Sequence, residues 1–387
     1  MKQEIFCGRG TGVPYADVMD LLNLSFNFTE PERQFFGLLP KCYREQYRPQ
    51  NSNYVVVDED GVLAAAVGAY DHELVVCGRR LPCRGIGNVA VHPDHRRKGY
   101  MKMAMNRSLE DMIKDGIALS TLGGRRQRYQ FFGFDKAGPL YSFGISPQNI
   151  HHLFNDRTSA FTVREVTDPA DPVIDEIIAL NQRQPVTPIR PREMYLDIAT
   201  SWHATLLVLA DGERFAGYAI RVWGSTISEI QVVQDEDFLE SLLALYGHLG
   251  GGFAVQIPAW QAGYAAALAP VAEDSSLTNA MYFNILNYRL VIEAFLALKL
   301  TYTTLPDGEI TLLIHGYARD ERVRVSVRGG EPAVEIIPDA VPVDCELSHL
   351  DAIAFLFAPV CLAREKAIDL ARIWFPLPAC MYRADEV

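Results

Sequence analysis

The sequence has no apolar run long enough to cross a membrane and no cysteine pair spaced like a metal site. Its longest apolar stretches, such as residues 62–67 and 354–358, fall far short of the roughly 20 residues that span a bilayer. The seven cysteines are an odd number and form no Cys-x-x-Cys pair, which predicts free buried thiols and no metal. A membrane-spanning protein and a zinc protein are therefore not expected.

The first ten residues, MKQEIFCGRG, lack the apolar core of a secretory signal, so we expect a cytoplasmic protein. The 36 Lys and Arg against 48 Asp and Glu give a net charge of −12, which disfavours binding to nucleic-acid phosphates. We expect no nucleic-acid partner and no membrane partner. A local basic cluster is informative in such a chain, because the overall charge opposes an anion.

The 387 residues are enough for two to three domains, and the first part of the chain alternates strand and helix patterns. After the strands, a basic loop containing glycine precedes a helix that begins near Met101 and ends near Gly116. The strands predicted around it are residues 53–57, a hairpin of 62–70 with 73–77, residues 86–91 and residues 117–122.

A second, weaker copy of this element order follows. Strands are predicted at 205–209, 215–222, 226–233 and 253–257, with a helix at 238–246. Where the first copy has its basic loop, the second has Gln-Asp-Glu-Asp at 234–237, which would repel a phosphate. The copy therefore repeats the fold without the chemistry.

The last hundred residues predict a small α+β unit. A helix at 286–300 leads into strands, and two further helices follow. The predicted strands are 309–314, 322–327 and 333–337, and the predicted helices are 348–357 and 361–373. No low-complexity linker separates the three parts, so extensive interfaces between them are expected.

The basic loop has the order strand, loop, helix, which places unpaired helix amides at its end. Such amides, together with the helix dipole, attract anions such as a diphosphate. Arg96, Arg97 and Lys98 add positive charge, and Gly99 lets the backbone approach a ligand closely. The alternative is a solvated basic turn before a surface helix.

The segment from Val89 to Tyr100 reads VAVHPDHRRKGY, and with the surrounding elements it resembles the coenzyme A loop of GNAT N-acetyltransferases. The family pattern Gln/Arg-x-x-Gly-x-Gly/Ala is met at Arg96 and Gly99, whereas Met101 departs from it. The three-part layout resembles the Eis-like acetyltransferases. This resemblance implies an α/β (α+β) fold with tandem GNAT domains that have mixed central sheets, at 1–145 and 146–283, the second degenerate. It also implies a sterol-carrier-like α+β domain at 284–387.

The resemblance also implies a site for acetyl-CoA as co-substrate, without a metal. The strand end would hold the acetyl-pantetheine arm, and the loop would bind the pyrophosphate. Free amides where the strand splays would polarise the thioester carbonyl as it becomes an oxyanion. The cofactor-binding residues implied are Val89, Ala90, Val91, Arg96, Arg97, Lys98, Gly99 and Tyr100.

Eis-like enzymes carry a Tyr-x-x-Phe-Gly-aromatic sequence whose tyrosine protonates the departing thiolate, and Tyr129 begins a matching sequence here. The alternative is that Tyr129 is an ordinary core aromatic beside the neighbouring phenylalanines. Just before it, where the family commonly has Ser-Glu, the sequence has Gly-Gly-Arg at 123–125. Arg125, together with Arg126 and Arg128, is a candidate to bind an acidic part of the substrate or the phosphate of the coenzyme. The arginines are equally well explained as solvated charges.

An amine that arrives as an ammonium must lose a proton before it can attack. In Eis-like enzymes the terminal carboxylate of the chain reaches the active site, and here that group belongs to Val387. The family's terminal residue is often aromatic, and a frayed acidic tail is the alternative. His72 and His92 are further candidates for the base.

The prediction is an acetyl-CoA-dependent N-acetyltransferase that acts on a primary amine of a cationic small molecule or a lysine. Direct transfer is expected, since no nucleophile grouping stands out. A homo-oligomer is expected from the family resemblance. The alternative is a non-catalytic protein that senses coenzyme A or binds an apolar ligand in its C-terminal domain.

Overall fold

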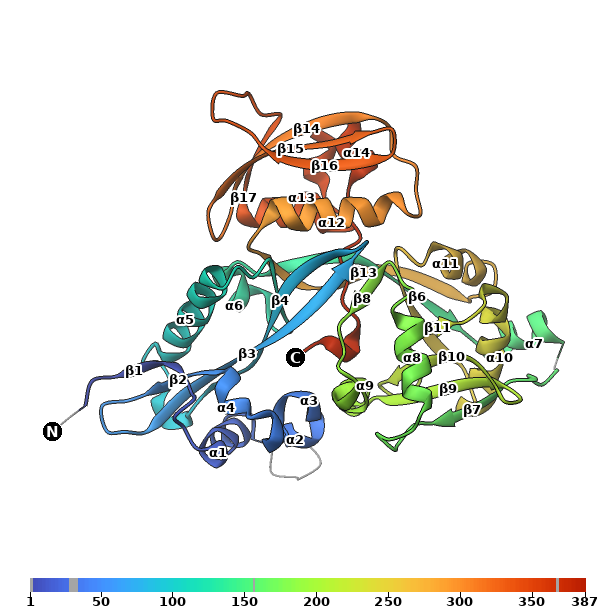
Figure 1. The fold of residues 1–387 in the computed structure, drawn as a ribbon, viewed down its shortest axis with the longest axis horizontal. Helices are drawn as coiled ribbons and strands as arrows, with labels where there is room; N and C mark the ends of the chain where they lie inside the picture. The colour runs from blue at the N-terminus through green and yellow to red at the C-terminus, as the bar shows by residue number, and fades with distance from the viewer. Residues whose placement is uncertain (1–2, 28–33, 156, 367–368) are drawn as a thin grey trace.

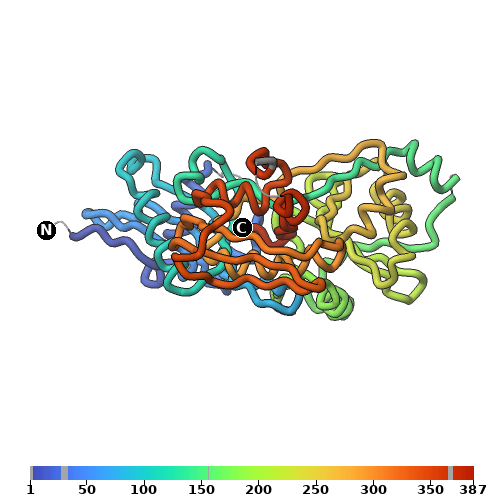
Figure 2. Tube along the Cα trace, turned by 90° about the horizontal axis from the view of Figure 1, so that it is seen from above, coloured from blue at the N-terminus to red at the C-terminus, as the bar shows by residue number. Residues whose placement is uncertain are grey.

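The computed structural model describes residues 3–27, 34–155, 157–366 and 369–387. It is a mixed α/β molecule in which thirteen described strands form one large sheet and four form a smaller one. The predicted α/β class with mixed sheets is confirmed. Figure 1 shows two lobes side by side with the smaller sheet above them, and Figure 2 shows this smaller unit lying over the centre of an elongated molecule.

The first lobe contains the basic loop and its flanking elements. Its strands are β1 (Phe6–Arg9), β2 (Asn53–Val57), β3 (Leu63–Val76), β4 (Arg79–Val91) and β5 (Leu119–Leu122). Its helices are α1 (Tyr15–Phe26), α2 (Phe35–Leu38), α3 (Pro40–Tyr43), α4 (Pro49–Ser52), α5 (Tyr100–Lys114) and α6 (Arg126–Tyr129). The helix predicted after the basic loop is therefore confirmed as α5.

The hairpin predicted between 62–70 and 73–77 is wrong, because β3 runs without a break from Leu63 to Val76. Asp71 stays in the strand opposite Arg84 of β4. The turn lies instead at Cys77 and Gly78, whose φ angles are 47° and 76°. Two consecutive residues with positive φ are typical of the tight turn that joins antiparallel strands.

The second lobe repeats an antiparallel arrangement around β9 to β11. Its strands are β6 (Asp135–Ile145), β7 (Thr162–Glu165), β8 (Val186–Pro188), β9 (Thr205–Asp211), β10 (Arg214–Val222), β11 (Thr226–Val232), β12 (Phe253–Pro258) and β13 (Asp274–Ile285). Its helices are α7 (Pro147–Phe154), α8 (Val173–Asn181), α9 (Tyr195–Ala199), α10 (Phe238–Leu249) and α11 (Ala262–Leu268). The strands and the helix predicted between 205 and 257 are confirmed within a few residues.

The two lobes share one sheet, because strands cross between them. The strand order is β1-β2-β3-β4-β5-β13-β6-β12-β11-β10-β9-β7, with β8 paired to β3. Strand β13, which was not predicted, lies between β5 and β6. The division into parts at 145 and 283 therefore stays a proposal, in which β13 belongs to the second part by sequence and pairs with the first.

The smaller unit is a four-stranded sheet covered by helices. Its sheet order is β16-β15-β14-β17. Its elements are α12 (Tyr288–Leu300), β14 (Gly308–His315), β15 (Asp320–Arg328), β16 (Glu331–Ile336), β17 (Cys345–Ser348), α13 (His349–Phe357) and α14 (Asp369–Trp374). Part of the predicted helix 361–373, residues 367–368, lies outside the described residues; a short 3-10 helix, Leu362–Lys366, precedes this gap.

Helices α12 and α13 lie between the small sheet and the large one (Figure 1). One apolar core joins Phe295 of α12 and Leu312 of β14 to Val76 and Leu119 of the large sheet. Because the core is continuous, the small unit is fixed against the two lobes. No described helix is long and apolar enough to cross a membrane.

Candidate active site

Strands β4 and β5 separate in the middle of the large sheet. They pair in parallel from Cys83 opposite Leu119 to Ile86 opposite Leu122, where β5 ends while β4 continues to Val91. On its other edge β4 stays paired with β3, and His92 donates its amide to Ala64 beyond the strand end. Because backbone groups alternate along a strand, the amides of Val89 and Val91 face the open edge.

A bulge in β4 sits at this separation and is held by a buried polar cluster. Asn88 has φ of 35°, and the register with β3 shifts between Ala66 and Gly68. The Asn88 amide donates to Asn53 at 2.7 Å, while its oxygen accepts from the hydroxyls of Tyr43 and Tyr70. A Cβ at Gly68 would lie 2.0 Å from the Asn88 oxygen, so this position requires glycine.

The predicted cofactor residues lie at the end of β4, in the following loop and at the start of α5. Ala90 is buried, Val89 and Val91 are partly buried, and Tyr100 is buried at the start of α5. Between them, Arg96, Arg97, Lys98 and Gly99 are exposed.

The loop turns sharply into α5 with two left-handed residues, Arg97 at φ of 68° and Gly99 at φ of 86°. Lys98 lies 3.3 Å from His95, whose ring is 3.2 Å from Asp58, and this fixes the base of the loop. The exposed cations thus surround the free amides of a 15-residue helix, which fits a diphosphate.

Tyr129 ends the short helix α6 and is 7% exposed. It belongs to the same apolar cluster as Tyr100, against which Val89 and Val91 pack. Its ring lies so close to the backbone that a Cβ at Gly124 would be 2.6 Å from it. Burial raises the pKa of Tyr129, and the neighbouring Arg128 partly opposes this. The hydroxyl is therefore protonated at neutral pH and is able to act as an acid.

The three arginines before Tyr129 have different surroundings. Arg126 makes two hydrogen bonds to Asp135 of β6, at 2.6 and 2.9 Å. Arg125 and Arg128 are exposed. Arg126 thus fixes α6 to the sheet, while Arg125, the predicted substrate residue, faces solvent.

The last residue of the chain lies on β4, just before the bulge. A Cβ at Gly85 would be 2.5 Å from the Val387 side chain, and one at Gly87 would be 3.4 Å from the Val387 carboxyl carbon. Both glycines therefore give room to the chain end. Figure 1 shows the C-terminus between β4 and the second lobe. The chain end is therefore not a tail that extends from the surface.

Residues 380–387, the C-terminal tail, are anchored by both lobes. From the first lobe, buried Lys41 donates to the carbonyl of Ala384. From the second lobe, Arg190 donates to both carboxylate oxygens of Asp385, at 2.8 and 2.7 Å. The indole of Trp202 donates to the carbonyl of Glu386 at 3.2 Å.

A cavity of 370 Å³, the Val387 cleft, opens beside the chain end. Its walls combine aliphatic and aromatic side chains with a few charged groups. They include Lys41, Tyr47, Tyr70, Asp71, His72, Ile189, Met194, Ile198, Asp385 and Val387.

The two candidate histidines lie in different places. His72 lines the Val387 cleft, and burial lowers its pKa to about 4, so the ring is neutral at pH 7. Its Nδ1 lies 3.4 Å from the Tyr70 carbonyl, and among the described residues its buried Nε2 has no hydrogen-bond partner. His92 instead accepts the Asp94 amide at the start of the basic loop.

The seven cysteines are free, and burial raises the pKa of Cys42, Cys83 and Cys380 to about 12. Such thiols are poor nucleophiles. Within the ranges that the structure describes, no three His, Cys, Asp or Glu side chains are grouped to hold a metal ion.

Comparison with known proteins identifies the first lobe. Residues 13–137 match the family model described as an acetyltransferase (GNAT) domain. None of the curated proteins matches the sequence.

Solved structures of similar fold cover nearly the whole chain. A GCN5-related N-acetyltransferase from Kribbella flavida has 16% identity and a TM-score of 0.69, over 99% of this chain and 98% of that one. Eis1 from Mycobacterium abscessus has 16% identity and a TM-score of 0.63, over 100% of both chains. A probable N-acyltransferase from Enterococcus faecalis, described as a conserved protein of unknown function, has 18% identity and a TM-score of 0.67, over 98% of both.

The fold is thus shared along the full length of the chain. Residues 13–137 are similar to GNAT acetyltransferase domains, and this similarity supports an acyltransferase that takes its acyl group from coenzyme A.

Proposed function

We propose that the protein transfers an acetyl group from acetyl-CoA directly to a primary amine bound in the Val387 cleft. The observation that carries this proposal is the position of the chain end. The Val387 carboxyl group lies on β4 at Gly87, immediately before the open edge formed by residues 89–91. A proton acceptor and a thioester site are therefore adjacent on one strand.

In this mechanism the amides of Val89 and Val91 bind the pantetheine arm and polarise the thioester carbonyl. Arg96, Arg97 and Lys98 bind the pyrophosphate with the α5 amides. The amine nitrogen attacks the carbonyl carbon, and the carbon–sulfur bond then breaks. Tyr129 gives its proton to the sulfur, and the Val387 carboxylate accepts the proton that the amine loses.

Lys41 helps to keep the incoming amine neutral. Burial lowers the pKa of the Lys41 ammonium to about 8, although Cys42 and Asp385 partly oppose this. A second ammonium in the same cleft would meet the same low polarity and the repulsion of Lys41. The acceptor amine is therefore easier to deprotonate in the cleft than in water.

The cleft favours an amine with an apolar body over a polycation. Its side-chain carboxylates are already paired, Asp71 with Arg84 at 2.5 Å and Asp385 with Arg190 at 2.7 Å. Much of the remaining wall is aromatic or aliphatic, and includes Tyr47, Tyr70, Ile189, Pro191, Met194 and Ile198. The net charge of −12 is thus not concentrated here, and a monoamine or a lysine side chain fits better than a polyamine.

The alternative function, binding of an apolar ligand in the C-terminal unit, has less support. The interior of that unit is filled by large side chains that are at most 2% exposed, namely Phe295, Phe355, Phe357 and Trp374. Such packing is typical of a core that supports the tail.

Arg97→Ala is expected to raise the KM for acetyl-CoA about tenfold with a smaller change in kcat, because one charge-assisted contact to the pyrophosphate is lost. The measurement is the release of free coenzyme A with phenethylamine and N-acetyl-lysine methyl ester as acceptors. Lys114→Ala, at the other end of α5, is the control and should leave the KM unchanged. Equal KM values for the two variants would contradict the assigned phosphate site, and no release with any amine would contradict the proposed function.

Tyr129→Phe is expected to lower kcat about tenfold and leave the KM for acetyl-CoA unchanged. This loss is smaller than is usual when a general acid is removed, because a thiolate is already a good leaving group. Burial raises the pKa of Tyr129, so the wild-type enzyme should keep its acid at every pH up to about 10. Tyr54→Phe removes another buried hydroxyl of the same cluster and should not change kcat. Equal kcat values in both variants would assign Tyr129 to packing alone.

A further inference from the structure

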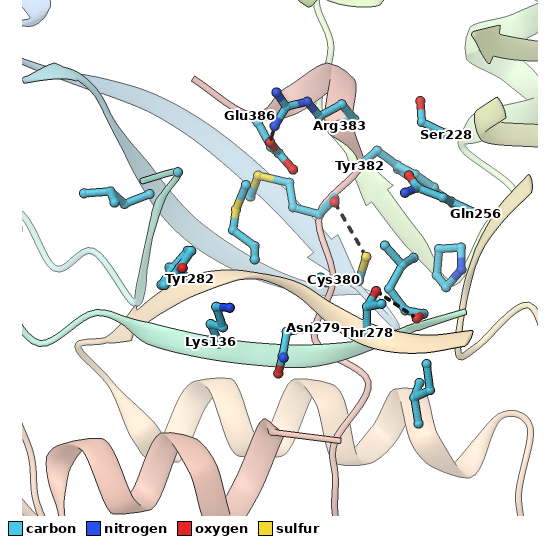
Figure 3. Close-up of a pocket in the computed structure, with 18 of the residues that line it drawn as sticks. Lys136, Ser228, Gln256, Thr278, Asn279, Tyr282, Cys380, Tyr382, Arg383 and Glu386 are labelled. Atoms are coloured by element: carbon cyan, nitrogen blue, oxygen red, sulfur yellow. Dashed lines mark hydrogen bonds and ion pairs between the residues drawn. The ribbon is translucent and has the colours of Figure 1, made fainter. Parts of the chain in front are cut away.

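A second and larger cavity lies on the other side of the C-terminal tail. This Arg383 cavity has a volume of 540 Å³ and is enclosed by the tail and by β13, β6, β12 and the end of β5. Figure 3 shows Arg383 and Glu386 on the tail, above the strands that carry Lys136, Tyr282 and Asn279. Neither the proposed transfer nor the Val387 cleft uses this space.

The charge of the cavity is opposite to that of the chain. Among its described lining residues, the charged side chains are Lys136, Arg383 and Glu386. Two cations and one carboxylate leave a charge of +1, in a protein whose net charge is −12. A local excess of positive charge in an acidic protein is typical of a site that selects an anion.

Both cations have unused capacity to bind. Lys136 is exposed and lies over the Tyr282 ring at 5.8 Å, and among the described residues its ammonium has no ion-pair partner. Arg383 pairs with Glu386 and is stacked between Trp202 and Trp223, each at 4.5 Å. Its Nε is buried and has no acceptor within the described part of the chain.

Burial of Arg383 makes its charge costly, and it lowers the pKa of the guanidinium to about 10. A bound carboxylate would offset that cost and would accept the free Nε–H group. The aromatic and methionine side chains around it, including Trp223, Met281 and Met381, suit the apolar part of a ligand.

The cavity also reaches the position where transfer would occur. Leu122 and Gly123, at the end of β5 where β4 separates, form one of its walls. Glu386, on another wall, directly precedes the Val387 residue that lies on β4. A group that extends from the reacting centre could therefore enter the cavity, whose volume far exceeds that of an acetyl group.

We infer that the Arg383 cavity binds a carboxylate carried by one of the two reactants, through Lys136 and Arg383. This inference rests on the proposed function, since it assumes that the reacting centre lies beside Val387. The carboxylate has two possible sources, a dicarboxylic acyl group on coenzyme A or an amine acceptor that also carries an acid.

The test compares pairs of reactants that differ only at their far end. Glutaryl-CoA is compared with pentanoyl-CoA as donor, and 6-aminohexanoate with hexylamine as acceptor. The full-length enzyme is expected to prefer the acid in one pair by about tenfold in kcat/KM, the value of one charge-assisted contact. The pair that shows the preference identifies the source of the carboxylate.

Lys136→Met is expected to abolish this preference, because it removes one of the two cations proposed to bind the carboxylate. Lys136 is exposed, so its replacement should not disturb folding. Lys114→Met, on the far end of α5, is the matched control and should retain it. In an enzyme that does acetylate an amine, a preference for neither acid, or a preference that Lys136→Met retains, would overturn the inference.

A binding measurement keeps the inference separate from the proposed function. Glutarate is titrated against the full-length protein and followed by tryptophan fluorescence, because Trp223 lines the cavity. Saturable binding that Lys136→Met weakens about tenfold supports the inference even if no acetyl transfer to any amine is found, in which case only the proposed function fails. If glutarate does not bind and neither acid is preferred, although amines are acetylated, the inference is wrong and the proposed function stands. Trp223→Phe, which should remove the signal, is the control for the probe.

Discussion

Removal of Val387 is expected to lower kcat/KM for acetyl transfer about 10²- to 10³-fold, the usual range for loss of a general base. The shortened chain still ends in a carboxylate, but this group is displaced by about 3.5 Å, the length of one residue. A general base must lie within hydrogen-bond reach of the proton it accepts. The anchors at Ala384, Asp385 and Glu386 hold the rest of the tail in place, so the new end should not shift to compensate.

Val387→Ala is the matched control for this deletion. It keeps a terminal carboxylate at position 387 and removes only the side chain that contacts Gly85. Its kcat/KM should stay within about threefold of the wild-type value, since small losses of surface contact cost less than 1 kcal/mol. Acetyl transfer is measured with one fixed amine at saturating acetyl-CoA.

His72 is the competing base, and the same measurements separate it from Val387. Burial lowers the pKa of His72 to about 4, so its ring is unprotonated and able to accept a proton at neutral pH. If His72 is the base, the enzyme without Val387 keeps its activity and His72→Gln loses it. That pattern would contradict the role proposed for the chain end.

Much of the fold could be predicted from local sequence patterns. The helical spacing after the basic loop predicted α5, and short apolar runs predicted β2 and β9 to β12. Strand β13 was missed because its first half is exposed and has no alternation of buried and exposed residues. Its place between β5 and β6 depends on pairing with residues that are more than 100 positions away.

The proposed cofactor-binding residues were also accessible from the sequence, because they are nearly consecutive and their order encodes a strand, a loop and a helix. The position of Val387 was different. The contact with Gly85 joins residues 302 positions apart (387 minus 85), and nothing in the sequence near either residue predicts it. Only the resemblance to Eis-like enzymes suggested that the chain end reaches the site.

The role of the second lobe could not be predicted at all from its altered loop. Residues 235–237 are acidic, as the sequence indicated, and the lobe instead contributes contacts to the tail. Arg190 and Trp202 bind the tail directly, and Glu229 pairs with Arg190. In the proposed mechanism the lobe thus orients the chain end for the reaction of the first lobe, through side chains from three separate segments.

Arg190→Met is expected to release the tail from this arrangement at a cost of about 3–5 kcal/mol, the usual loss when one partner of a buried ion pair is removed. Arg190 donates to Glu229 at 3.0 and 2.8 Å and to Asp385 at 2.8 and 2.7 Å. The side chains of Arg190, Glu229 and Asp385 are only 2%, 0% and 8% exposed. Without the arginine, two buried carboxylates face each other.

The stability that the tail loses in Arg190→Met should be larger at pH 7.5 than at pH 4.5. In the wild-type protein, burial raises the pKa of Asp385, but Arg190 and Lys41 outweigh it and hold this pKa below its ordinary value. Asp385 therefore contributes stability above the ordinary carboxylate pKa, and this stability disappears as the pH falls through the lowered pKa. In the variant Lys41 still opposes burial, but the contribution of Arg190 is lost and Glu229 is left unpaired nearby, so the pKa of Asp385 rises and protonation at low pH relieves the repulsion. The difference in the free energy of tail opening between the wild-type protein and Arg190→Met thus decreases as the pH falls.

Hydrogen exchange of residues 380–387 is the direct measurement, because the loss is confined to opening of the tail. A cost of 3–5 kcal/mol corresponds to a rise of more than about a hundredfold in the opening equilibrium. Arg192→Met, in the same segment, removes a partly exposed pair with Asp175 and should change exchange of the tail by less than about fivefold. Adding Glu229→Gln and Asp385→Asn to Arg190→Met should restore most of the protection, since no buried carboxylate is then left unpaired. If residues 380–387 exchange at the same rate in the Arg190→Met and Arg192→Met variants, the second lobe does not hold the chain end. The acceptor site must then be fixed by Lys41 and the first lobe alone.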